Sequence, residues 1–323
     1  MQINLCKRSC DGILSKNCTE NPDFCNYNHV FIGYCDGSSF SGRRDGAHNG
    51  LMYRGRPNLD AVLDSLITKG LGNATNVVFT GGSAGGLTTY LQVDHVRSRL
   101  PNVGTVKGLG DAGWFLDTLT WDSVNASRAE FEYAYNMWNS STGVNDACIT
   151  ANGGGEEWKC IFAQYTFPHI ATPTFIAEGA YDSWQMGNIL KLPCHNCAAE
   201  CTAAGCPPGA VADCCGNDTY TEKFLEYGVQ MKASISAAVA AKPAGMAGAF
   251  VSGCIVHCQT IFNEGEDRWD HWKIAGRKPR EVFHSFYFAD RAGNGDSNGN
   301  GGSDAIAIDA DVYPQNPSCP IWT

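Results

Sequence analysis

The sequence of 323 residues has no long apolar segment and few basic residues. No hydrophobic run approaches the roughly 18 residues that a membrane-spanning helix needs, so a transmembrane segment is not expected. Lys and Arg total 23 against 33 Asp and Glu, and a formal charge of -10 repels nucleic-acid phosphates at long range. The composition therefore predicts a soluble globular protein that does not bind nucleic acid.

A signal peptide is also absent from the first residues. Residues 1–8 read MQINLCKR and lack the apolar stretch of a secretory leader. The 16 cysteines nevertheless form an even set, which is typical of disulfide-bonded proteins in an oxidising compartment. We expect a secreted protein of the extracellular space or cell wall, whose chain here begins after its signal peptide. Sequons compatible with glycosylation on that route begin at Asn17, Asn73, Asn125, Asn139 and Asn217.

Short apolar runs alternate with helical patterns along the chain. Strands are predicted at 28–35, 76–80, 105–109, 173–178 and 248–252, and helices between Pro57 and Gly70 and from Leu87 to Leu100. Strands that alternate with helices indicate a mainly parallel sheet covered by helices on both faces. We therefore expect a single α/β domain over residues 1–323.

Two segments depart from this pattern. Residues 194–215 contain Cys194, Cys197, Cys201, Cys206, Cys214 and Cys215, and are predicted to form a disulfide-stapled insertion. The C-x-x-C spacing at its start also fits zinc ligands, an alternative that a cysteine-rich chain makes the weaker one. Residues 292–304 are nearly all Gly, Asn, Asp and Ser, without the spacing of a calcium loop, and are predicted to be a flexible loop. We expect no metal and no cofactor.

A candidate nucleophile lies in Gly81-Gly82-Ser83-Ala84-Gly85, which matches the pattern G-x-S-x-G. In this motif the serine occupies a sharp turn between a strand and a helix, with its hydroxyl exposed. A second match surrounds Ser297, but it lies in the glycine-rich tract, with no strand before it and no helix after it. Only Ser83 has the required strand and helix, so we expect Ser83 to be the nucleophile.

A serine nucleophile needs a base, and the base needs a carboxylate that orients it. The histidines after the motif and its helix are His169, His195, His257, His271 and His284. His257 follows a predicted strand, where a parallel sheet delivers residues to its carboxyl edge, so we expect it to be the base. By the same reasoning Asp182, which follows the strand at 173–178, is the expected acid, and Asp111 is its rival.

Several blocks resemble the pectin acetylesterase family, to which the Notum deacylases also belong. The blocks are NPDF at 21–24, YCDGSSFSG at 34–42, GSAGGL at 82–87, DAGWFLD at 111–117, AYDSWQ at 180–185 and CIVHCQ at 254–259. The resemblance implies an α/β-hydrolase fold and a serine carboxylesterase with Ser83, Asp182 and His257 as its triad. The family's Gly-Gly-Gly-Trp-Cys block and the first strands of its sheet have no counterpart here, so we expect a member that starts late.

The predicted reaction is hydrolysis of an O-acetyl ester on a cell-wall polysaccharide such as pectin, by a monomer. The backbone N–H of Ala84 is the expected oxyanion donor. A charge of -10 favours a neutral or esterified stretch of the polysaccharide over a polyanionic one. Two alternatives remain: a deacylase that removes a lipid from a protein, with Trp114, Phe115 and Leu116 as candidate pocket residues, and a catalytically inactive glycan-binding relative.

Overall fold

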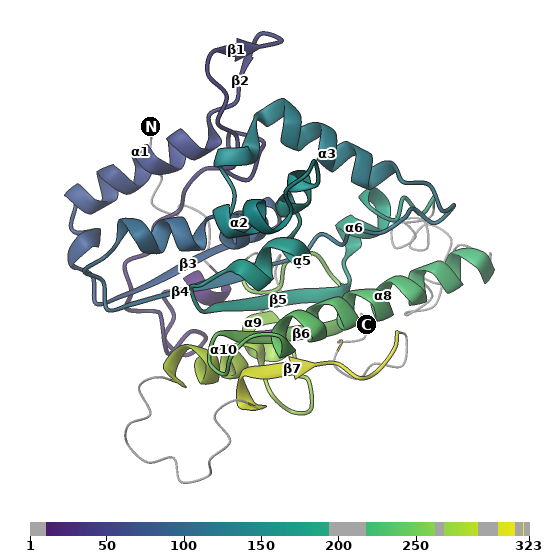
Figure 1. The fold of residues 1–323 in the computed structure, drawn as a ribbon. Helices are drawn as coiled ribbons and strands as arrows, with labels where there is room; N and C mark the ends of the chain where they lie inside the picture. Colours follow the sequence, from purple (N-terminus) through teal and green to yellow (C-terminus); the bar gives the residue numbers. More distant parts are fainter. Residues whose placement is uncertain (1–10, 194–217, 262–267, 290–302, 314–318, 320–323) are drawn as a thin grey trace.

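The computed structural model describes residues 11–193, 218–261, 268–289, 303–313 and 319. Its centre is a five-stranded sheet with the order β3-β4-β5-β6-β7, in which all neighbouring strands are parallel (Figure 1). The strands are β3 Asn76–Gly82, β4 Thr105–Asp111, β5 Thr174–Tyr181, β6 Ala247–Ile255 and β7 Ile306–Ile308. Because the strands are parallel, the carboxyl ends of all five meet at one edge of the sheet.

Helices cover both faces of this sheet, as the alternation along β5 shows (Figure 1). Ile176 packs in a cluster with residues of α2 and α8, while Phe175 and Ala177 pack with residues of α10 on the opposite face. The α-helices are α1 Gly55–Thr68, α2 Ala84–Arg99, α3 Ala126–Trp138, α4 Asp146–Ala151, α5 Ala163–Thr166, α6 Ser183–Asn188, α8 Asp218–Ala240, α9 Arg268–His271 and α10 Pro279–Phe288. The α/β architecture predicted from the sequence is confirmed.

Four of the predicted strands correspond to β3, β4, β5 and β6, and the two predicted helices to α1 and α2. The strand predicted at 28–35 is wrong, because this segment has no pairing partner in the structure. Val30, Phe31 and Tyr34 are 45%, 46% and 45% exposed, and only Ile32 of the apolar residues in this segment packs, half-buried, against a core cluster. A small hairpin of β1 Ala47–His48 and β2 Leu51–Met52 stands apart from the main sheet instead (Figure 1).

Disulfides in the described chain close loops of different lengths. The bonds are Cys18–Cys25, Cys148–Cys160 and Cys254–Cys319, while Cys35 and Cys258 are free. The predicted insertion at 194–215 lies outside the described residues, as does the predicted flexible loop, apart from a 3-10 turn at Ser303–Ala305. Within the described part of the chain, no helix is long and apolar enough to cross a membrane.

Candidate active site

Ser83 occupies a strained turn between β3 and α2. Its backbone has φ 58 and ψ -123, a conformation that a residue with a Cβ rarely adopts. The Ser83 N–H donates to the Asp111 carbonyl at 2.8 Å, which ties the turn to the end of β4. A Cβ on Gly81 would lie 2.5 Å from the Gly85 backbone, and one on Gly86 would lie 2.3 Å from the Asp111 carbonyl oxygen. Close backbone approach therefore requires glycine at positions 81 and 86.

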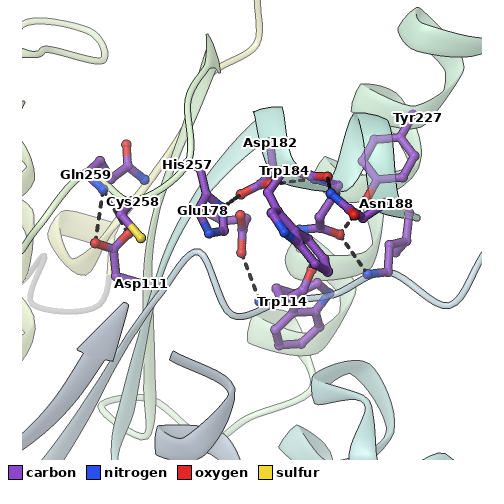
Figure 2. Close-up of polar contacts among 12 residues, drawn as sticks. Asp111, Trp114, Glu178, Asp182, Trp184, Asn188, Tyr227, His257, Cys258 and Gln259 are labelled. Atoms are coloured by element: carbon purple, nitrogen blue, oxygen red, sulfur yellow. Dashed lines mark hydrogen bonds and ion pairs between the residues drawn. The ribbon is translucent and has the colours of Figure 1, made fainter. Parts of the chain in front are cut away.

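Asp182 and His257 are joined by a hydrogen bond at the carboxyl edge of the sheet. Asp182 directly follows β5, and its Oδ2 accepts from His257 Nδ1 at 2.7 Å (Figure 2). Its other oxygen, Oδ1, accepts from the Gln185 N–H at 2.8 Å and caps helix α6. The Asp182 side chain is 0% exposed, whereas the His257 side chain is 21% exposed. This geometry fixes the imidazole ring and leaves Nε2 as the nitrogen available to a substrate or a nucleophile.

The charge environment makes His257 a stronger base than an ordinary histidine. Burial alone lowers the pKa of His257, because it disfavours the charged ring. The hydrogen bond to Asp182 and the negative charges of Asp182 and Asp111 outweigh burial, so the pKa of His257 lies above its usual value of 6.5. A raised pKa suits a group that accepts a proton and then returns it.

Asp111, the rival acid, has a different set of partners. Its carboxylate accepts from the Gln259 N–H at 3.0 Å (Figure 2), and also from the Thr260 N–H at 2.7 Å and the Thr260 hydroxyl at 2.8 Å. These bonds fix the loop that follows His257. Asp111 thus holds both turns of the site, that of Ser83 through its carbonyl and that of His257 through its side chain.

The other histidines weighed as candidate bases do not join Asp182 and His257. His169 closes a 3-10 turn that precedes β5, at the amino end of that strand. His284 pairs with Asp23 at 3.0 Å, and His271 ends α9. His195 and Ser297 lie outside the described residues. In the part of the chain that the structure describes, no group of three His, Cys, Asp or Glu side chains could hold a metal ion.

Trp184 is an aromatic neighbour of the site that sequence patterns did not single out. Its ring stacks beside that of His257, with centroids 6.2 Å apart and an interplanar angle of 30°. The Phe115 ring also packs against it, with centroids 5.2 Å apart. Trp184 is 40% exposed. Trp114, Phe115 and Leu116 are 0%, 5% and 4% exposed, so the three candidate pocket residues are packed in the interior.

Glu178 was also missed, because a charged residue inside an apolar strand gives no motif. It lies in β5, is 0% exposed, and its Oε2 accepts from the Trp114 N–H at 2.9 Å (Figure 2). Burial and the charge of Asp182 raise the pKa of Glu178 well above its usual range. The sequence marks Glu178 only by its spacing, since it lies four positions before the candidate acid Asp182.

Several known proteins named as esterases are similar to this chain in sequence. The chain is 31% identical over 316 residues to Pectin acetylesterase 5 of Arabidopsis thaliana, and this alignment covers 95% of this chain and 67% of that protein. It is 33% identical over 195 residues to the human palmitoleoyl-protein carboxylesterase NOTUM, covering 55% of this chain and 38% of that protein. The alignment with Pectin acetylesterase 4 of Arabidopsis thaliana spans 44% of that relative.

A solved structure extends this similarity over nearly the whole fold. The Wnt deacylase Notum from Drosophila superposes with a TM-score of 0.71 at 25% identity, covering 97% of this chain and 80% of the Notum chain. The fold is therefore that of an α/β-hydrolase, as the sequence predicted. The family model described as Pectinacetylesterase matches residues 5–320. The chain belongs to the pectinacetylesterase family of esterases.

Proposed function

We propose that the protein is a serine carboxylesterase that removes O-acetyl groups from a cell-wall polysaccharide such as pectin. Ser83 is the nucleophile, His257 the general base and Asp182 the residue that orients the base. The observation that carries this proposal is the hydrogen bond of 2.7 Å between Asp182 and His257, at the same sheet edge as the strained Ser83 turn.

The proposed reaction proceeds in two halves. The Ser83 hydroxyl attacks the ester carbonyl while His257 Nε2 takes its proton. The imidazolium then gives this proton to the sugar oxygen as its bond to the acetyl carbon breaks, which releases the sugar hydroxyl. Water next attacks the acetyl-enzyme by the same route and releases acetate. Asp182 keeps the proton on Nδ1 and stabilises the imidazolium at each stage, because its carboxylate is 0% exposed and hydrogen-bonded on both oxygens.

Negative charge on the former carbonyl oxygen needs donors in place before the reaction. Ala84 is the first residue of α2, so its N–H has no partner within the helix and lies at the positive end of the helix dipole. We assign the Ala84 N–H as one oxyanion donor. Loss of one such donor typically reduces kcat by about 10² to 10³.

The choice of a polysaccharide rests on the surface beside the base. Trp184 presents a partly exposed aromatic ring next to His257, and such a ring packs well against the apolar face of a sugar. The relatives named as pectin acetylesterases point to the same substrate class. The described disulfides agree with a secreted enzyme.

A protein deacylase is the second candidate, because the Notum structure covers 97% of this chain. A long acyl chain needs an open apolar surface, and Trp114, Phe115 and Leu116 offer little of it, since they are 0%, 5% and 4% exposed. A panel of p-nitrophenyl esters separates the two candidates. The proposal expects faster turnover of the acetate than of the octanoate, and release of acetate from acetylated pectin.

Replacement of the nucleophile tests the reaction itself. Ser83→Ala is expected to lower kcat on p-nitrophenyl acetate at least about 1,000-fold while the far-ultraviolet circular dichroism stays unchanged. Ser297→Ala, in the second match to the same motif, is the matched control and is expected to retain activity. Full activity in Ser83→Ala would overturn the assignment.

A further inference from the structure

Three carboxyl groups are buried together at the carboxyl edge of the sheet. Asp111, Glu178 and Asp182 are each 0% exposed. Glu178 lies in β5 and Asp182 directly follows that strand, and the two carboxyl groups are close enough for the charge of Asp182 to raise the pKa of Glu178. Figure 2 shows the Glu178 carboxyl between the Trp114 backbone and the pair of Asp182 and His257.

The hydrogen bonds of Glu178 are incomplete if it is ionised. Oε2 accepts from the Trp114 N–H at 2.9 Å, whereas Oε1 is buried and no donor in the described part of the chain faces it. No Lys or Arg among the described residues forms an ion pair with Glu178. A buried carboxylate with one unpaired oxygen and no cation costs several kcal/mol, so the neutral acid is strongly favoured.

The groups that face Glu178 from its neighbours reinforce this preference. Asp182 and Asp111 repel a negative charge on it, and they come from the end of β5 and from β4. Tyr90 of α2 and Tyr227 of α8 are buried phenols whose pKa values are raised, so both remain neutral. His257 bonds to Asp182, and Cys258, whose thiol pKa is raised by burial, is also neutral.

We propose that Glu178 is a positioning residue that acts as a neutral acid, with Oε2 accepting the Trp114 N–H and the Oε1 hydroxyl donating to the Asp182 carboxylate. This inference rests on the proposed triad. Asp182 then accepts three hydrogen bonds, from Gln185, His257 and Glu178. The extra donor stabilises the Asp182 carboxylate, which would otherwise compete with the imidazole for the Nδ1 proton. Glu178 keeps its proton throughout turnover.

The protonated state has a signature that does not depend on activity. The infrared spectrum of the wild-type protein at neutral pH is expected to contain the carbonyl stretch of a buried carboxylic acid. That band is expected to vanish in Glu178→Gln and to persist in the control Asp94→Asn, whose carboxylate accepts backbone N–H groups of Ala171 and Thr172 at the amino end of β5. Persistence of the band in Glu178→Gln would overturn the proposal.

The pH dependence of kcat/KM on p-nitrophenyl acetate then tests the link to the triad. A glutamine is uncharged and supplies both a donor and an acceptor, so Glu178→Gln is expected to keep kcat within about threefold. The acid limb of the profile, where kcat/KM falls as pH decreases, is expected to keep its midpoint. Glu178→Leu, which offers neither group, is expected to lose about tenfold or more in kcat and to move the acid limb to higher pH, because Asp182 becomes a stronger partner for imidazolium.

The opposite shift identifies the competing state. If Glu178 were ionised, Glu178→Gln would remove a negative charge near His257, lower the pKa of that histidine and move the acid limb to lower pH. That result would refute the neutral acid. The infrared band is measured without turnover, so its presence together with an inactive wild-type protein would refute the proposed function and leave the protonation state established.

Discussion

At the scale of single residues, the site depends on where the polypeptide places charge. His257 is only partly buried, yet Asp182 beside it and Asp111 below the loop are fully buried. The hydrogen bond to Asp182 and two buried negative charges near the imidazole favour its protonated form and outweigh desolvation. Asp182 also binds a backbone N–H, so its position does not depend on the histidine alone. The acid and the base are therefore held before any substrate binds.

The raised pKa of His257 predicts the acid limb of the pH profile. The base must be neutral, so kcat/KM is expected to fall as pH decreases through the pKa of His257, with a midpoint above the usual value of 6.5. Asp182→Asn removes the charge that raises this pKa and is expected to lower kcat by roughly 10⁴. Asp111→Asn is the control. It is expected to reduce the free energy of unfolding, and to lower kcat far less than Asp182→Asn does. A limb with its midpoint below 6 in the wild-type enzyme would contradict this account.

At the scale of elements, the sequence predicts a strand or helix correctly where its local apolar pattern matches the way the segment packs in the fold. The strand at 76–80 was predicted from a short apolar run and the helix from Leu87 from apolar residues at helical spacing, and both pack against the core. Residues 28–35 show an equally good strand pattern, but a strand exists only with a partner, and pairing cannot be read from one segment. The three-residue β7 is too short to give a pattern.

Some residues of the candidate site can be predicted from the sequence and others cannot. Ser83 follows from a motif, and Asp182 and His257 follow from their places after strands, because a parallel sheet gathers such residues at one edge. Glu178 and Trp184 do not follow from spacing. Their relevance depends on side-chain burial and on contacts between β5, the loop at Trp114 and the loop at His257, which only the folded structure reveals.

The turn between β3 and α2 supplies a test with a matched control. Gly86→Ala places a Cβ 2.3 Å from the Asp111 carbonyl oxygen, so it must separate α2 from β4 and is expected to cost about 1–3 kcal/mol or more of unfolding free energy. Gly85 lies in the same helix with nothing within 4 Å of a Cβ. Gly85→Ala is therefore expected to be neutral or to stabilise by about 0.5–1 kcal/mol. Urea denaturation of both variants measures the difference, and equal stabilities would contradict the close contact.

At the scale of the whole molecule, the disulfides differ in how much chain they close. Cys254–Cys319 joins β6 to a residue 65 positions later, whereas Cys18–Cys25 spans 7 positions. Cys254 is 2% exposed and lies three residues before His257, so the longer bond also anchors the strand that delivers the base. A cross-link restricts the unfolded chain more when its loop is longer.

Paired removal of each bond tests this difference in loop length. Replacing Cys254 and Cys319 together by alanine is expected to lower the free energy of unfolding by about 4 kcal/mol, against about 2 kcal/mol for Cys18 and Cys25 together. Paired replacement leaves no unpartnered thiol from either bond, so exchange with the other cysteines is not provoked. Urea denaturation compares the two variants with the wild-type protein, and p-nitrophenyl acetate turnover reports on His257. A larger loss from the pair at 18 and 25 would show that local packing, rather than loop length, sets the contribution of these bonds.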